Sequence, residues 1–321
     1  MSGINRTENP KHLLKNIAII CFILIALSNI IAFFHPARGY ELSIYKSTPA
    51  LVWIFLIISI AGGVTIIVHQ VYTKEYKNSN FWLFGLLILI LSRMSLLYIP
   101  FIRGYYTWRG DNISHIGAVK DVLLTGHVAT GNFYPGTHIL LAELTSISGA
   151  PIELIANHIT GLFSILYVVF IYLLATTVLH ERGQQLLVFG AIGGVIFNDY
   201  EVFLRPNALS FLMLPLVLFL YFKHSIKYRI PFVILLVLYP FFHPFSSIVL
   251  VASFIAIGLS QATLGYKYKI GRKEREPFSI VPILIVLCIL LPWILSFQWF
   301  ELNIRLLFKR LTTGYLSLIH I

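Results

Sequence analysis

The hydrophobic positions of this chain are gathered in long continuous runs that polar stretches separate. Nine such runs cover residues 16–34, 50–71, 81–102, 153–179, 186–197, 207–222, 230–242, 245–264 and 278–297. Within a bilayer only helices and closed barrels satisfy every backbone group, and continuous apolar runs, rather than short alternating ones, are typical of helices. The pattern therefore predicts an all-α fold: a polytopic transmembrane helical bundle with about nine spans.

Composition points to the same class. Hydrophobic residues make up 58% of the chain and charged residues 12%, whereas about 25% of the residues of a soluble protein are charged. A chain this apolar cannot bury its hydrophobic surface in one water-soluble core. Its two cysteines, Cys21 and Cys288, both fall inside predicted spans, which excludes a disulfide framework and a thiolate metal site.

Several runs in the second half are short for a membrane span. Runs of 12 or 13 residues, such as 186–197 and 230–242, do not cross a hydrocarbon layer of about 30 Å. Helices of this length usually end in a protein-lined, wet cavity. The polar breaks that follow them, Asn198-Asp199 and His243-Pro244, are expected on the same side of the membrane.

The basic residues set the expected orientation. With the N-terminus inside, fourteen Lys and Arg residues fall in inner connections and six in outer connections before residue 250. This positive-inside bias predicts a multi-pass protein of the cell membrane with a cytoplasmic N-terminus and an outward polar segment. The net charge of +11 then indicates contact with membrane lipids, and no nucleic-acid partner is expected.

Three parts are expected along the chain: residues 1–102 with about three spans, an outer loop at 103–152 with amphipathic helices, and the remaining bundle at 153–321. The spacing over 113–126 predicts an interfacial helix with its apolar residues toward apolar surroundings. These residues are Ile113, Ile116, Val119 and Leu123 or Leu124. The tail LSLIHI resembles translated sequencing adaptor, so we expect the natural protein to continue beyond residue 321.

Candidate chemistry is concentrated in the outer loop. Asp111 stands at the start of the predicted helix, and His115 lies one turn further on the same face. As an N-cap, Asp111 would accept hydrogen bonds from the amides of Ile113 or Ser114. As a functional pair, the carboxylate and imidazole could act as a general base or bind a divalent metal ion.

Polar residues also mark the two later breaks and one span. One short apolar run is followed by three charged residues, Asp199, Glu201 and Arg205. They either belong to an ordinary solvated loop or form part of a functional site. His243 is either a hydrogen-bonded core residue or a ligand. Arg93, well inside the third span, either pairs with an anionic substrate group or, the interpretation we favour, snorkels to the interface.

One family resembles this arrangement. An Asp soon after a span, a following His, a helix ending near TGH and then YPGTHILL resemble the first outer loop of GT-C-fold membrane glycosyltransferases. RPNALSF and the His-Pro at 243–244 are similar to later features of that family. The resemblance covers roughly residues 100–300, favours the archaeal or bacterial type, and matches Asp111 to the family's essential acidic residue. Asp199 or Glu201 matches the second acid.

The resemblance implies transfer of a sugar from a polyprenyl-phosphate donor to a glycan, lipid or protein acceptor on the outer face, in the making of a cell-surface glycan. Asp111 and His115 would be catalytic, and Arg205 or Arg109 would hold the phosphate, because a guanidinium fork matches phosphate oxygens. The further candidates are His243, Tyr134 and His138 for substrate contacts, and Asp111 with Asp199 for a metal ion.

A divalent ion, Mg or Mn, would be the cofactor, but an Asp-x-Asp doublet is missing, so metal dependence stays open. Two other functions stay open as well: a transporter or flippase for a lipid-linked or anionic solute, and a non-catalytic membrane assembly subunit. The enzyme predicts that Asp111, Asp199, Glu201 and His243 converge on one outward-opening cavity, with carboxylates within about 10 Å.

Overall fold

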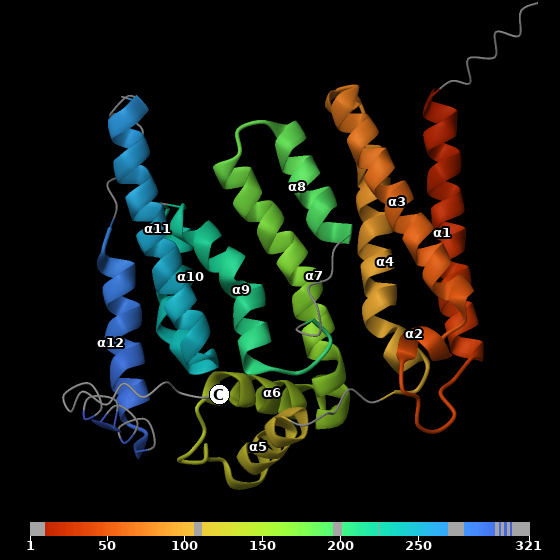
Figure 1. The fold of residues 1–321 in the computed structure, drawn as a ribbon. Coiled ribbons are helices and arrows are strands. Elements are labelled where there is room, and N and C mark those ends of the chain that lie inside the picture. The colour runs from red at the N-terminus through yellow and green to blue at the C-terminus, as the bar shows by residue number, and fades with distance from the viewer. Residues whose placement is uncertain are drawn as a thin grey trace, which may run out of the picture.

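The computed structural model describes residues 10–105, 111–194, 201–223, 225–268 and 279–298, together with Leu302, Arg305, Leu306 and Lys309. Throughout these residues the fold is helical, with no strands (Figure 1). The all-α prediction is therefore confirmed. Arg109 and Asp199 lie outside the described residues.

Three long helices form the N-terminal group: α1 (Pro10–Phe34), α3 (Ala50–Tyr72) and α4 (Trp82–Ile102), with short α2 (Ile44–Ser47) and the 3-10 turn η1 (Glu75–Lys77) in the connections. Gly63 of α3 and Gly85 of α4 let two backbones approach closely. A Cβ on Gly63 would lie 2.9 Å from the Gly85 carbonyl oxygen. Small residues at helix crossings are the usual means of tight packing in membranes.

Six helices form the second group: α7 (Ile152–Val178), α8 (Arg182–Gly194), α9 (Pro206–Tyr221), α10 (Ile226–Phe242), α11 (Pro244–Tyr268) and α12 (Val281–Leu295). Helix α7 packs against α8 and α9, and α10 packs against α9 and α12. Helix α8 also contacts α3 and α4, so it joins the two groups. Its Gly190 and Gly193 face Ile67 and Leu89 at contact distance.

Two shorter helices, α5 (Asp111–Thr125) and α6 (Pro135–Ser148), lie across one end of the bundle (Figure 1), which we name the α5–α6 end. The helix predicted over 113–126 is thus confirmed, and it begins two residues earlier. Ile116 and Val119 are buried in a cluster with residues of α6 and α7. Ile113 and Leu124 are 60% and 85% exposed, so only part of the predicted apolar face packs against the rest of the protein.

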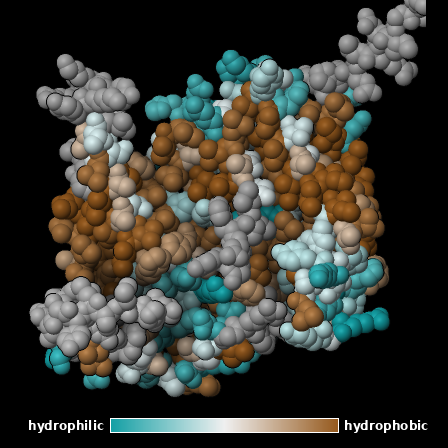
Figure 2. Space-filling model, in the orientation of Figure 1, coloured by the Kyte–Doolittle hydropathy of each residue, from teal (hydrophilic) through white to brown (hydrophobic). Residues whose placement is uncertain are grey.

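Five helices among the described residues are long and apolar enough to cross a membrane: α1, α3, α4, α7 and α11. Helices α9 and α12 are apolar but shorter. In Figure 2 hydrophobic surface forms a broad band, and hydrophilic surface lies at both ends. The chain is a multi-pass membrane protein in this sense, and the expectation of about nine spans stays a prediction.

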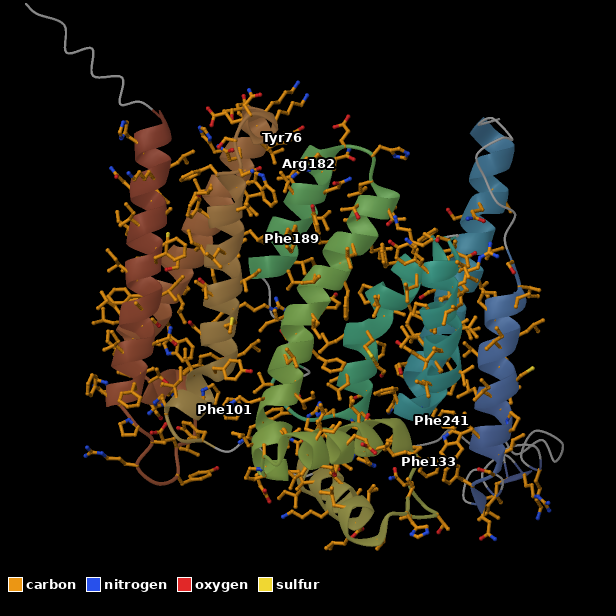
Figure 3. The ribbon with its side chains drawn as sticks, turned by 180° about the vertical axis from the view of Figure 1, so that it is seen from behind. Tyr76, Phe101, Phe133, Arg182, Phe189 and Phe241 are labelled. Carbon is orange, nitrogen blue, oxygen red and sulfur yellow. The ribbon has the colours of Figure 1, made fainter. Side chains whose placement is uncertain are left out.

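The connections between helices separate into two sets at opposite ends of the bundle. Figure 3 shows Tyr76 and Arg182 at one end, and Phe101, Phe133 and Phe241 at the other, which is the α5–α6 end. At the α5–α6 end, Arg103 ties the 35–49 connection to the end of α4. Its guanidinium donates to both carboxylate oxygens of Glu41, at 2.9 and 3.0 Å, and to the Thr48 hydroxyl at 2.8 Å.

Candidate functional site

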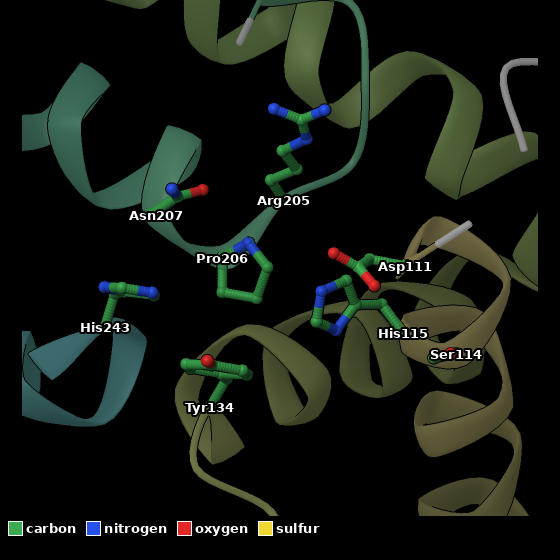
Figure 4. Close-up of a pocket in the computed structure, with 8 residues that line it drawn as sticks. All are labelled: Asp111, Ser114, His115, Tyr134, Arg205, Pro206, Asn207 and His243. Atoms are coloured by element: carbon green, nitrogen blue, oxygen red, sulfur yellow. The ribbon is translucent and has the colours of Figure 1, made fainter. Parts of the chain in front are cut away.

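A cavity of about 460 Å³ lies at the α5–α6 end (Figure 4). It is lined by Asp111, Ser114, His115, Tyr134, Arg205, Pro206, Asn207 and His243. Five of these are residues that the sequence singled out: Asp111, His115, Tyr134, Arg205 and His243. They come from α5, from the connection before α6, from the start of α9 and from the turn between α10 and α11.

Four helices begin at this cavity. Asp111 is the first residue of α5, Tyr134 and Arg205 immediately precede α6 and α9, and His243 immediately precedes α11. Proline stands at the first position of α6, α9 and α11, where its fixed φ suits a helix start and its missing N–H costs nothing. The unpaired amides and partial positive charge of helix N-termini favour anions.

Asp111 is exposed at the cavity rim. Among the hydrogen bonds of the described residues, none joins its carboxylate to an amide of α5, so the capping interaction considered above is not formed there. The carboxylate lies close enough to His115 to oppose the effect of burial on the pKa of that imidazole. Burial is the larger effect, and the pKa of His115 is lowered from its usual value.

Behind His115 lies a chain of hydrogen-bonding side chains. His115 Nδ1 is 3.0 Å from His138 Nε2, and His138 Nδ1 is 2.9 Å from Asn132 Oδ1. His138 is 2% exposed. Burial, and after it the neighbouring His115, lower the pKa of His138 from 6.5 to about 4, so this imidazole is neutral at pH 7.

The sequence suggested that His138 contacts the substrate, but the structure gives it a different position. It does not line the cavity but supports His115 from the side of α6. Asn132 was missed by the sequence analysis. An asparagine in the connection NFYP has the ordinary appearance of a turn residue, and only the fold brings it to His138.

Tyr134 and His243 form one wall of the cavity. Their rings stack with centroids 5.0 Å apart and planes 2° from parallel. The Tyr134 ring also meets His115 edge to face, with centroids 5.8 Å apart. Burial and the charge of Asp111 raise the pKa of Tyr134, and burial and His115 lower that of His243. Both rings are therefore uncharged at pH 7 and offer an aromatic surface with polar edges.

Arg205 supplies the positive charge of the cavity lining. It occupies the N-cap position of α9, with its guanidinium carbon 5.8 Å from the centroid of the Phe203 ring. Figure 4 shows its side chain and that of Asp111 on neighbouring walls of the cavity. Arg109, the second candidate for holding phosphate, and Asp199, the second candidate metal ligand, lie outside the described residues.

Glu201 lies elsewhere. It is fully buried and forms an ion pair with Arg93 of α4, and the Ser164 hydroxyl of α7 donates to the same carboxylate oxygen. Arg93 is 1% exposed and also donates to the Ile192 carbonyl oxygen at 2.9 Å. The preferred interpretation of Arg93 as a snorkelling residue is therefore wrong. The Arg93 guanidinium stays inside the bundle and is paired there with the buried Glu201 carboxylate. An unpaired charge at that place would be costly.

The predicted convergence is thus met by Asp111 and His243, whereas Glu201 does not line the cavity. The described residues do not by themselves make a metal site: no group of three His, Cys, Asp or Glu side chains among them is arranged to hold a metal ion. Comparisons with protein-family models, curated proteins and solved structures found no match for this chain.

Proposed function

We propose that this chain is a GT-C-like membrane glycosyltransferase that transfers a sugar from a polyprenyl-phosphate donor to an acceptor hydroxyl at the α5–α6 end. The proposal includes about nine spans, a cytoplasmic N-terminus and an outward-facing cavity. The acceptor class, whether glycan, lipid or protein, follows from the resemblance alone.

One observation carries the proposal. Asp111 and His115 of α5 line one cavity with Arg205, which comes from a distant part of the sequence, and four helices begin at this cavity. A base beside a cation and several helix N-termini is the combination that sugar transfer from a phosphate requires, since charge develops on the leaving phosphate and a proton must leave the acceptor.

The reaction assigns a task to each group. The acceptor oxygen forms a bond to the anomeric carbon of the sugar while its proton passes to the Asp111–His115 pair. The bond from that carbon to the phosphate oxygen breaks, and the polyprenyl phosphate leaves with the electron pair. Arg205 neutralises the phosphate, because its fork of N–H groups matches two phosphate oxygens. Tyr134 and His243 offer stacked rings against the apolar face of a sugar.

The position of the cavity favours an enzyme over a transporter. Transporters usually bind their substrate near the bilayer midplane, between helices that are broken at matching positions. This cavity is lined by residues of α5 and of the starts of α9 and α11. It therefore lies at the end of the bundle where α5 and α6 are placed across the other helices (Figure 1). A lipid carrier in the bilayer and an acceptor in water can both reach such a place.

The test is sugar transfer by Asp111→Asn in liposomes, with a panel of polyprenyl-phosphate sugars as donors. The variant should lose on the order of 10²-fold or more in rate, because a general base is removed. Its stability should change by less than about 1 kcal/mol, because Asn starts a helix about as well as Asp. Among the described residues, no backbone amide donates to the exposed Asp111 carboxylate, so the substitution removes no capping bond there.

Asp121→Asn is the matched control, since it makes the same chemical change on an exposed residue of the same helix. It should transfer sugar at the wild-type rate. Near-normal transfer by Asp111→Asn would remove Asp111 from the reaction. Movement of the lipid-linked sugar across the bilayer, without transfer by the wild type to any acceptor, would identify a flippase instead.

A further inference from the structure

The hydrogen-bonded chain behind His115 contains two residues that the proposed reaction does not use. His138 comes from α6 and Asn132 from the connection before it. Neither lines the cavity. His138 is nevertheless buried between polar partners on both ring nitrogens, with His115 at 3.0 Å and Asn132 at 2.7 to 2.9 Å. A buried imidazole and a half-buried amide, placed in series behind a cavity residue, can determine which ring nitrogen of that residue carries the hydrogen.

The orientation of the Asn132 amide is set by the backbone. The Tyr134 amide donates to Asn132 Oδ1 at 2.9 Å. A backbone N–H can only donate, so the atom it meets must be the oxygen rather than the nitrogen of the side chain. The same oxygen lies 2.9 Å from His138 Nδ1, and the amide nitrogen of Asn132 lies 2.7 Å from that ring nitrogen. With two lone pairs, it can accept from both donors at once.

Two neutral proton arrangements are then compatible with the distances. In the first, His138 Nδ1–H donates to Asn132 Oδ1, and His115 Nδ1–H donates to His138 Nε2. The second nitrogen of His115, Nε2, then carries a lone pair. In the second arrangement the Asn132 NH₂ group donates to His138, His138 donates to His115, and His115 Nε2 carries the hydrogen. A histidine's tautomer is set in this way by the bond that its other nitrogen makes.

We propose that Asn132 and His138 are positioning residues that hold His115 in the first arrangement, with the lone pair of Nε2 available to the cavity as the general base. The inference rests on the proposed function, which needs an atom that can accept the acceptor's proton, and it names that atom within the Asp111–His115 pair. The hydrogen of the acceptor hydroxyl moves to His115 Nε2 as the new glycosidic bond forms. The resulting imidazolium is stabilised by the Asp111 carboxylate and returns its proton to water.

The surroundings of His138 suit this role. A positioning imidazole must accept a hydrogen bond and must not take the transferred proton itself. His138 lies deep in the protein, and a charge on His115 opposes a second charge on it. The transferred proton therefore remains on His115, which lies beside the Asp111 carboxylate, and does not pass to His138.

Nitrogen NMR on the full chain in lipid nanodiscs, with ¹⁵N-labelled histidine, tests the tautomer directly. The His115 signals are assigned by their loss in His115→Gln. At neutral pH, Nδ1 should have the shift of a protonated ring nitrogen and Nε2 that of an unprotonated one. His138→Leu or Asn132→Leu should produce a mixture of the two tautomers, whereas His138→Gln, whose amide oxygen can accept from His115, should restore the first.

Sugar transfer is measured on the same samples. The two leucine variants should lose about tenfold or more in rate, and His138→Gln should regain most of it. His127→Leu is the control: His127 is an exposed histidine of the α5–α6 connection, bonded to Thr125 and away from the cavity. Its substitution should leave both the His115 signals and the transfer rate unchanged.

The outcomes separate this inference from the proposed function. A hydrogen on His115 Nε2 in the wild type, or His115 signals that do not change in His138→Leu and Asn132→Leu, would overturn the positioning role even if transfer is normal. The expected tautomer and its loss in both leucine variants, without any sugar transfer by the wild type, would leave the positioning role standing and overturn the glycosyltransferase.

Discussion

Two histidines near the α5–α6 connection, His127 and His138, differ in how far the fold buries them. His138, at 2% exposed, is surrounded by protein and by another imidazole, and its pKa falls to about 4. His127, in the connection before α6, is exposed. An imidazole that is neutral when folded and able to take a proton when unfolded connects stability to pH.

Acid should therefore destabilise the folded chain through His138. Its folded pKa of about 4 lies below the unfolded value of 6.5, so between these values the unfolded chain binds a proton that the folded chain does not. Stability is present above pH 6.5 and is lost as the pH falls toward 4. At pH 5 the loss amounts to roughly 2 kcal/mol, at about 1.4 kcal/mol for each pKa unit.

The measurement is denaturant unfolding in mixed micelles at pH 7.5 and pH 5. Wild type and His127→Gln should lose stability together, and His138→Gln should lose about 2 kcal/mol less. An identical loss in His138→Gln would show that this imidazole is not the group responsible.

At the scale of residues, the sequence could indicate chemistry but not partners. Asp111, His115, Arg205 and His243 stood out because charged or polar groups beside apolar runs are costly without a purpose. Asn132 carried no such signal. Arg93 and Glu201 were both noticed, but they are more than a hundred residues apart, and nothing in the spacing pairs them.

At the scale of helices, the Arg93–Glu201 pair joins α4 to the segment after α8, and the Ser164 hydroxyl of α7 bonds to both residues. Arg93 lies in α4, and its partners are Glu201, Ser164 of α7 and the Ile192 carbonyl of α8. The pair therefore fixes the segment after α8, four residues before Arg205 of the cavity. A buried pair of this kind gives an arrangement its specificity more than its stability.

Glu201→Ala should destabilise the fold by about 3–5 kcal/mol, because it leaves the buried Arg93 guanidinium without its carboxylate. The double variant Arg93→Met with Glu201→Leu should cost much less, since it removes both charges and keeps the volume filled. Unfolding of the purified protein by SDS in mixed micelles measures both. A double variant less stable than Glu201→Ala would contradict this account.

Helix positions were predictable because apolar runs are strong signals, and α5 was found from its spacing alone. Its packing was less predictable. Ile116 and Val119 pack against α6 and α7, whereas Leu124 is exposed. The spacing of apolar residues defines a helix face but not the neighbours that it will contact.

The close approach of α6 to α10 depends on Gly136, where a Cβ would lie 3.1 Å from the Phe241 backbone.

At the scale of the molecule, the sequence predicted the arrangement of the connections. The predicted outer loop, which forms α5 and α6, and the break at His243 lie together at the α5–α6 end, along with the 35–49 connection and the start of α9 (Figure 1). The 73–81 connection and the start of α8 lie at the opposite end, where Figure 3 labels Tyr76 and Arg182. This sorting follows from successive helices that run in opposite directions through the bundle. How α8 joins the two groups of helices could not be predicted, because it depends on contacts between residues distant in the sequence.

The direction of the bundle across the membrane is open to a labelling test. The basic residues predict that the α5–α6 end faces outward, because cytoplasmic connections carry the excess of Lys and Arg. Single cysteines are introduced at exposed positions of the two ends, in a background of Cys21→Ala and Cys288→Ser. They are Lys46→Cys and Thr130→Cys at the α5–α6 end, and Asn78→Cys and Ser225→Cys at the other.

A membrane-impermeant maleimide applied to intact cells should label Lys46→Cys and Thr130→Cys. Asn78→Cys and Ser225→Cys should react only after the membrane is opened, which also serves as the control that they are accessible. The reverse pattern would put the cavity on the cytoplasmic side, where the proposed donor would have to be presented from within the cell. Each helical span has its two ends on opposite sides of the bilayer, so all connections at one end of the bundle should share one side. Labelling that differs between the two cysteines of one end would contradict the separation of the connections into two sets.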